Sequence, residues 1–153
     1  MAVAKLSPNE REAANRAEAT ALLIRVGYRV YRPEADVDGE DLVLRDQAGR
    51  FVPVQLKGRP TVDWPRYGGR GISMLFPDPR GPLGRPWFLV PHDTLFGWVK
   101  NRHGHARGWN DAWSYPYLSG DLNAFLAAYL LQSPRPEEQD TADAGQEAAG
   151  PPA

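Results

Sequence analysis

The sequence of 153 residues contains no cysteine. This absence excludes a disulfide framework, a thiolate zinc site and a cysteine nucleophile, and it agrees with a reducing compartment. The sequence also has no run of 18 apolar residues, and its first residues lack the apolar stretch and cleavage site of a signal peptide. We therefore expect a cytoplasmic protein that has no membrane contact.

The sequence also has almost no net charge, since its formal net charge is −1 at pH 7. The distribution is nevertheless uneven: residues 134–153 hold one Arg against five acidic residues, and residues 50–110 hold ten Lys or Arg against three Asp. The basic excess suits a phosphate-binding surface, although a solvated basic loop region has the same composition. We expect one domain, residues 1–132, followed by a disordered tail of Pro, Ala, Glu and Asp, residues 133–153.

A helix is well marked near the start of the chain. Residues 7–10 form a capping-box sequence with Pro8 at the first helical position, and Gly27 supplies the end. Four apolar residues recur at helical spacing and predict the face that packs on the core, namely Ala13, Ala17, Ala21 and Ile24. Glu18 then lies beside this face, where its carboxylate reaches the rim of whatever the helix covers.

Three strands are predicted next, at residues 28–32, 40–45 and 51–57, from their β-branched and aromatic content. Residues 46–49 have the composition of a hairpin turn between the last two. In the third strand a period of two places Gln55 and Lys57 on one face, opposite Val52, Val54 and Leu56. Further along we expect strands at residues 72–76 and 86–91, a loop at 101–118 and a closing helix at 119–132. Residues 94–100 fit either a helix or a strand.

The second and third strands carry residues suited to metal-assisted phosphodiester hydrolysis. Mg²⁺ prefers oxygen ligands, which the carboxylate of Asp41, the amide of Gln55 and the carbonyl of Leu56 can supply. Such an ion acidifies a bound water and offsets charge on the phosphate, and Mn²⁺ can replace it. Lys57 would orient the water or stabilise the phosphorane, and Glu18 would hold the metal's water from the helix side.

These residues carry a family resemblance. The run GEDLVLRDQAGRFVPVQLKGR, residues 39–59, preceded by AEATALLIRVGYRVYRP, residues 17–33, resembles the PD-(D/E)XK nuclease superfamily. It is most similar to the branch with Gln-x-Lys on the third strand, which includes group I intron homing endonucleases. The resemblance spans residues 10–60 and implies an α/β fold with a restriction-endonuclease-like αβββαβ core, a mixed central sheet flanked by helices.

By the same resemblance the activity is a Mg²⁺-dependent endonuclease acting on DNA, with Glu18, Asp41, Gln55 and Lys57 as catalytic residues. Two positions depart from the family pattern. Asp41 follows Glu40 instead of a proline, and Gln55 replaces an acidic residue, which removes one negative charge. That loss weakens metal binding and would equally suit a site that has lost its activity.

The basic loops between residues 58 and 107 are the expected DNA-binding region, with Arg59, Arg66 and Arg70 as phosphate contacts. Cutting both strands with so small a subunit favours a homo-oligomer, because one site faces one strand. An inactive DNA-binding or protein-binding module on this scaffold, such as an immunity or assembly subunit, is the alternative that stays open. The aromatic residues between Trp109 and Tyr117 could stack on bases, but core packing is the favoured interpretation.

Overall fold

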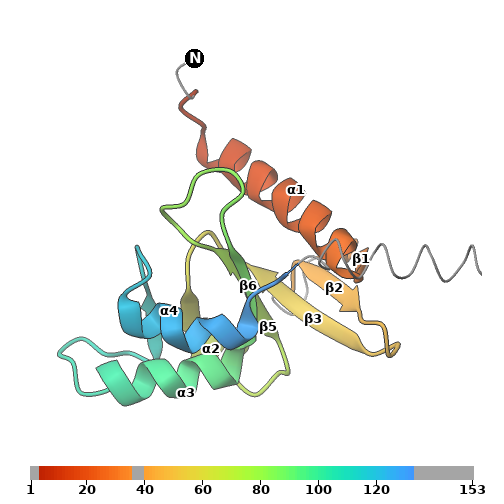
Figure 1. The fold of residues 1–153 in the computed structure, drawn as a ribbon. Coiled ribbons are helices and arrows are strands. Elements are labelled where there is room, and N and C mark those ends of the chain that lie inside the picture. The colour runs from red at the N-terminus through yellow and green to blue at the C-terminus, as the bar shows by residue number, and fades with distance from the viewer. Residues whose placement is uncertain (1–3, 36–39, 133–153) are drawn as a thin grey trace, which may run out of the picture.

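The computed structural model describes residues 4–35 and 40–132, and the structural statements below concern those residues (Figure 1). Its helices are α1 (Pro8–Val26), α2 (Trp64–Tyr67), α3 (His92–His103) and α4 (Gly120–Leu126), followed by a 3₁₀ turn η1 (Ala127–Tyr129). Its strands are β1 (Arg29–Tyr31), β2 (Leu42–Arg45), β3 (Phe51–Leu56), β4 (Thr61–Asp63), β5 (Ser73–Pro77), β6 (Trp87–Pro91) and β7 (Ala112–Ser114).

Five strands form one mixed sheet in the order β1-β2-β3-β5-β6. The pair β3 and β5 is parallel, whereas the other neighbours in this sheet are antiparallel. Strands β4 and β7 form a separate antiparallel pair. The predicted α/β class, a restriction-endonuclease-like αβββαβ core with a mixed sheet flanked by helices, is confirmed, although the helix between β3 and β5 is only the single turn α2.

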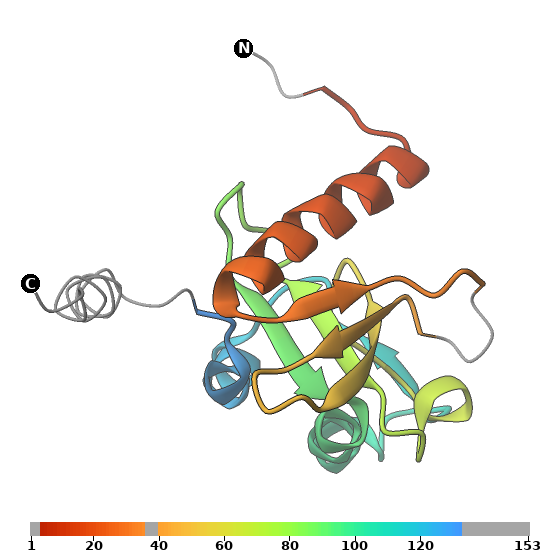
Figure 2. The same ribbon diagram turned by 90° about the vertical axis from the view of Figure 1, so that its right-hand side faces the viewer.

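The helices cover opposite faces of the sheet, α1 on one and α3 with α4 on the other (Figure 2). Beneath α1 lies a buried cluster that includes Leu23, Leu42, Val54 and Leu56. The second cluster joins α3, α4, β5 and β6 and includes Met74, Phe76, Leu95, Val99 and Leu122. Each fully buried large aliphatic side chain contributes about 1.5–3 kcal/mol, so both faces stabilise the sheet.

Helix α1 begins and ends as predicted. The Ser7 Oγ accepts from the Glu10 N–H at 3.2 Å, the Glu10 carboxylate accepts from the Ser7 N–H at 3.0 Å, and Gly27 has φ 113°. The predicted packing face is wrong: Ala13, Ala17 and Ala21 are exposed and Ile24 is 58% exposed, whereas Ala19 and Leu23 are fully buried. Alanines bury little area, so Leu23 and its neighbours decide how the helix turns toward the sheet.

The later half of the chain differs from expectation in two places. Helix α3 occupies the undecided residues 94–100 and runs on to His103, into the predicted loop, and that loop also contains β7. The closing helix is shorter than predicted, because it ends at Leu126 and continues as η1. Strand β7 is three residues long and is defined by its pairing with the distant β4, a partner that a local pattern does not reveal.

The aromatic residues of this region pack against the α3 and α4 cluster, as the core-packing interpretation requires. Trp109, Trp113 and Tyr115 are partly buried against it. His103 stacks on Trp113 with ring centroids 4.5 Å apart. The predicted tail, residues 133–153, lies outside the described residues. Within 4–35 and 40–132, no helix is both long and apolar enough to cross a bilayer.

Candidate active site

Asp41 lies where the pairing between β2 and β3 ends. Its N–H donates to the carbonyl of Val54 at 2.8 Å, and its Oδ2 accepts from the N–H of Leu56 at 3.1 Å. The side chain thus takes over from the backbone as the hydrogen-bond partner of β3. This contact fixes the carboxylate beside the strand that carries Gln55 and Lys57.

Gln55 is buried in the middle of this arrangement, with 9% of its surface exposed. Its Oε1 has no hydrogen-bond partner among the described residues. A buried polar group left without a partner costs about 1–3 kcal/mol. An oxygen in this position can accept a hydrogen bond from an ordered water or coordinate a cation.

Lys57 follows β3 on the same face as Gln55, and its ammonium lies 5.5 Å above the ring of Tyr67 in α2. Tyr67 is buried and packs edge-on against the buried His92, with centroids 5.7 Å apart. The His92 ring in turn accepts from the N–H of Asp63 at 2.9 Å, next to the start of α2. A cation over an aromatic face is attracted electrostatically, so this layer holds the Lys57 ammonium in place.

Asp41, Gln55, Leu56 and Lys57 all line one cavity of about 470 Å³. Its opposite wall is the N-terminal half of α1, which contributes Pro8, Arg11, Glu12 and Asn15. Those four residues follow the i, i+3, i+4, i+7 spacing of one helix face. That spacing could have identified these residues from the sequence, but the predicted face of α1 included only apolar residues.

Glu18 does not line this cavity, so the predicted meeting of its carboxylate with Asp41 is absent from the structure. Its Oε1 accepts from the indole N–H of Trp87 at 3.0 Å, and its Oε2 accepts from Arg85 Nη2 at 3.1 Å. The cause is the orientation of α1: with Ala19 and Leu23 toward the sheet, Glu18 points to β6. The α1 carboxylate that does line the cavity is Glu12, which is paired with Arg16 at 3.0 Å and is 62% exposed.

The three arginines expected to bind DNA are all exposed. Arg59 lies one residue beyond Gly58 and lines a cavity that also contains Glu18 and Arg85. Arg66, in α2, and Arg70, in the following turn, line neither of these two cavities. The structure thus brings one of the three next to the candidate site.

The donor set of the site suits a hard cation, but it carries little charge. Within the described part of the chain, no three His, Asp or Glu side chains come together as a metal site. Besides Asp41, the oxygen-bearing groups of this cavity are the neutral amides of Gln55 and Asn15, the backbone of Leu56 and the carboxylate of Glu12, which is exposed and paired with Arg16. Oxygen ligands fit Mg²⁺ and Mn²⁺, but the predicted ligands Asp41, Gln55 and Leu56 contribute a single negative charge, which implies weak binding without a substrate phosphate.

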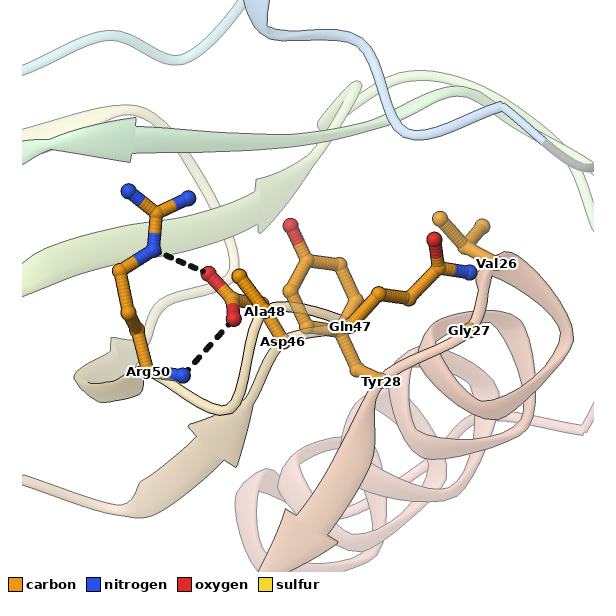
Figure 3. Close-up of a pocket in the computed structure, with 7 residues that line it drawn as sticks. All are labelled: Val26, Gly27, Tyr28, Asp46, Gln47, Ala48 and Arg50. Carbon is orange, nitrogen blue, oxygen red and sulfur yellow. Dashed lines mark hydrogen bonds and ion pairs between the residues drawn. The ribbon is translucent and has the colours of Figure 1, made fainter.

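Another cavity, of about 370 Å³, lies at the opposite end of α1 (Figure 3). It is lined by Val26, Gly27, Tyr28 and the turn between β2 and β3. In that turn the Asp46 carboxylate accepts from the backbone N–H of Arg50 at 2.8 Å and from its Nε at 2.9 Å. The backbone hydrogen bond lowers the pKa of the Asp46 carboxyl below its ordinary value. These contacts hold a hairpin turn, and they explain the cavity's charged groups without a ligand.

No protein-family model matches the chain, and no curated protein matches it. Among solved structures, the fold is similar to that described as "The structure of a bacterial homing endonuclease: I-Ssp6803I", with a TM-score of 0.48 and 15% sequence identity. The alignment covers 95% of this chain and 100% of the other. A likeness of this degree does not identify an activity, so the residues of the cavity decide what the chain can do.

Proposed function

We propose that the chain is a metal-dependent endonuclease that hydrolyses DNA phosphodiester bonds in the cavity between α1 and the end of β3. The observation that carries this proposal is that Asp41, Gln55 and Lys57 line one cavity, together with a Gln55 oxygen that has no hydrogen-bond partner among the described residues. Asp41, Gln55 and the carbonyl of Leu56 would hold Mg²⁺ or Mn²⁺. When bound, such an ion supplies an acidified water and offsets negative charge on the phosphate.

The protein side chains have distinct tasks in this proposal. Asp41 is fixed by the Leu56 N–H and presents its charge without reorganisation. Lys57, held over Tyr67, donates to a phosphate oxygen and stabilises the charge that develops there. Glu18 acts as a positioning residue, because its carboxylate orients Arg85 beside the site.

The test uses supercoiled plasmid with Mg²⁺ or Mn²⁺ at low salt, and two variants that preserve shape. Asp41→Asn keeps an oxygen that can accept from Leu56 while removing the charge, and Lys57→Met keeps the length of the side chain. Each is expected to lower the cleavage rate by about 10²–10³-fold, the usual effect of removing one electrostatic contact in a transition state. Lys100→Met, an exposed lysine on α3, is the control and should cleave as the wild type does.

Two results would overturn the enzymatic proposal: no cleavage of supercoiled, linear or single-stranded DNA with either metal, or an Asp41→Asn variant as active as the wild type. The rival function is an inactive DNA-binding or protein-binding module, and the observation that favours it is the neutral amide of Gln55 in place of an acidic residue. Such a module would bind its DNA or protein partner without a metal. Calorimetry would then show no Mn²⁺ binding that the wild type has and Asp41→Asn lacks.

A further inference from the structure

A second cavity, of about 540 Å³, adjoins the candidate active site along α1. Three arginines line it, Arg11, Arg59 and Arg85, and its lining contains one carboxylate, that of Glu18. Arg11, Asn15 and Gly58 belong to the walls of both cavities. The two spaces therefore lie side by side, and a ligand could extend from one into the other.

Arg85 is held in a fixed orientation within this cavity. Its Nη2 donates to Asn15 Oδ1 at 2.6 Å and to Glu18 Oε2 at 3.1 Å, and its Nε donates to Glu18 Oε1 at 3.3 Å. The guanidinium also lies 5.5 Å from the centroid of the buried Trp87 ring. Only 16% of the side chain is exposed, so Arg85 is ordered before any ligand arrives.

The same contacts leave part of the guanidinium available. Among the described residues, nothing accepts a hydrogen bond from Arg85 Nη1, while Glu18 is occupied by Arg85 and Trp87. The β5–β6 loop, residues 78–86, carries Arg85 and passes beside α1 in Figure 1. A Cβ at Gly81 would lie 2.5 Å from the Cβ of Arg85, so only glycine allows this approach. The loop and the helix together build the cavity around one preoriented donor.

We propose that this cavity, defined by Arg11, Arg59 and Arg85, is a subsite for a backbone phosphate of the bound nucleic acid, next to the phosphate that is cleaved. Three guanidinium groups against one neutralised carboxylate favour an anion, and guanidinium geometry matches phosphate oxygens. Arg11 and Asn15, which line both cavities, are about one helical turn apart, roughly 6 Å along the axis of α1. Successive phosphates of one DNA strand are about 3.4 Å apart along the duplex axis, so a few nucleotides span this distance. One strand can therefore place phosphates in both cavities, and this inference rests on the function proposed above.

The test follows the Arg85 Nε–Hε signal by nuclear magnetic resonance, assigned with an Arg85→Lys variant. The probes are a 12-base-pair DNA duplex, without metal so that no cleavage occurs, and inorganic phosphate. We expect both probes to shift the wild-type signal. In the double variant Arg11→Gln, Arg59→Gln the shift should be lost and duplex affinity should fall at least tenfold. Both replaced side chains are exposed, so the double variant should fold. An Arg85 signal at the wild-type position, measured without either probe, would verify this.

Arg29→Gln is the matched control, because Arg29 is exposed beside the turn at the other end of α1. It removes the same charge and should change duplex affinity less than twofold. A shift with inorganic phosphate but not with the duplex would overturn the strand subsite in favour of a free-phosphate site. A duplex that binds without moving the signal would also overturn it. If the signal moves while plasmid cleavage is absent, the subsite stands and the nuclease function fails.

Discussion

Gln55 is the residue that bears most directly on whether the site binds a metal. A neutral amide stands where a carboxylate would give the site a further negative charge, and its buried oxygen has no hydrogen-bond partner within residues 4–35 and 40–132. A further charge would strengthen metal binding, but a carboxylate buried at this position would carry a desolvation penalty when no cation is present. The amide thus gives up metal affinity and avoids that penalty.

Substituting Gln55→Glu should raise metal affinity and lower the stability of the metal-free protein. We expect Mn²⁺ to bind at least tenfold more tightly by calorimetry, about 1.4 kcal/mol. The metal-free variant should melt at a lower temperature than the wild type, and saturating Mn²⁺ should raise its Tm by more than it raises that of the wild type. Gln47→Glu, at an exposed position of the β2–β3 turn, is the control and should leave metal affinity unchanged. Equal Mn²⁺ affinity in the Gln55→Glu variant and the wild type would rule out residue 55 as a ligand.

The sequence located some residues of the site better than others, for a geometric reason. Gln55 and Lys57 could be placed together because a strand has a fixed period of two, and Asp41 because the hairpin turn sets which residues of β2 and β3 are opposite each other. Glu18 was misplaced because a helix rich in alanine gives little indication of which face packs. The face of α1 that turns toward the sheet is fixed by tertiary packing, and this face decides which α1 residues line the cavity.

The hairpin of β2 and β3 is the element on which the site depends. Its pairing runs from Arg45 opposite Phe51 to Leu42 opposite Val54, which brings Asp41 to Leu56. The turn is closed by Asp46, whose carboxylate accepts from Arg50 and whose N–H donates to the Arg50 carbonyl at 2.9 Å. A loosened turn would therefore disturb the contact between Asp41 and β3.

Asp46→Asn should destabilise the protein in a pH-dependent way. The Arg50 hydrogen bond lowers the pKa of Asp46 in the folded state from its ordinary 3.8. A lowered folded-state pKa gives a contribution that is present above the unfolded-state pKa and lost as pH falls through the folded-state value. The Tm difference between wild type and Asp46→Asn should thus be constant from pH 5 to 7 and should shrink below about pH 4.

Glu34→Gln removes an exposed carboxylate and serves as the reference, with little change in Tm at any of these pH values. A Tm difference for Asp46→Asn that stays the same down to pH 2 would mean that the charge of Asp46 does not stabilise the turn.

Other elements could not be predicted from local sequence as the β2–β3 hairpin could. Helix α3 and strand β7 both contact β4, which is far from each of them in sequence, whereas the hairpin is local.

At the scale of the whole molecule, the net charge is near zero but the charged residues are unevenly distributed. Residues 50–110 contribute a basic excess, and the fold brings Arg59 from that segment together with Arg11 of α1 and Arg85 of the β5–β6 loop. Composition alone predicted a phosphate-binding region, but it could not include Arg11, because α1 lies outside the basic segment. The surface is assembled by topology as much as by local charge.

The salt dependence of DNA binding should report how much of this surface the duplex covers. Each phosphate contact contributes about 0.9 to the slope of log affinity against log salt concentration. If Arg59, Arg66 and Arg70 all contact phosphates, each single change to Gln should lower the slope by about one, and the triple change by about three. Arg29→Gln should leave the slope as it is. A slope that responds to Arg59→Gln alone would confine the duplex to the two cavities beside α1, because Arg66 and Arg70 line neither, and would contradict the broader contact region predicted from the sequence.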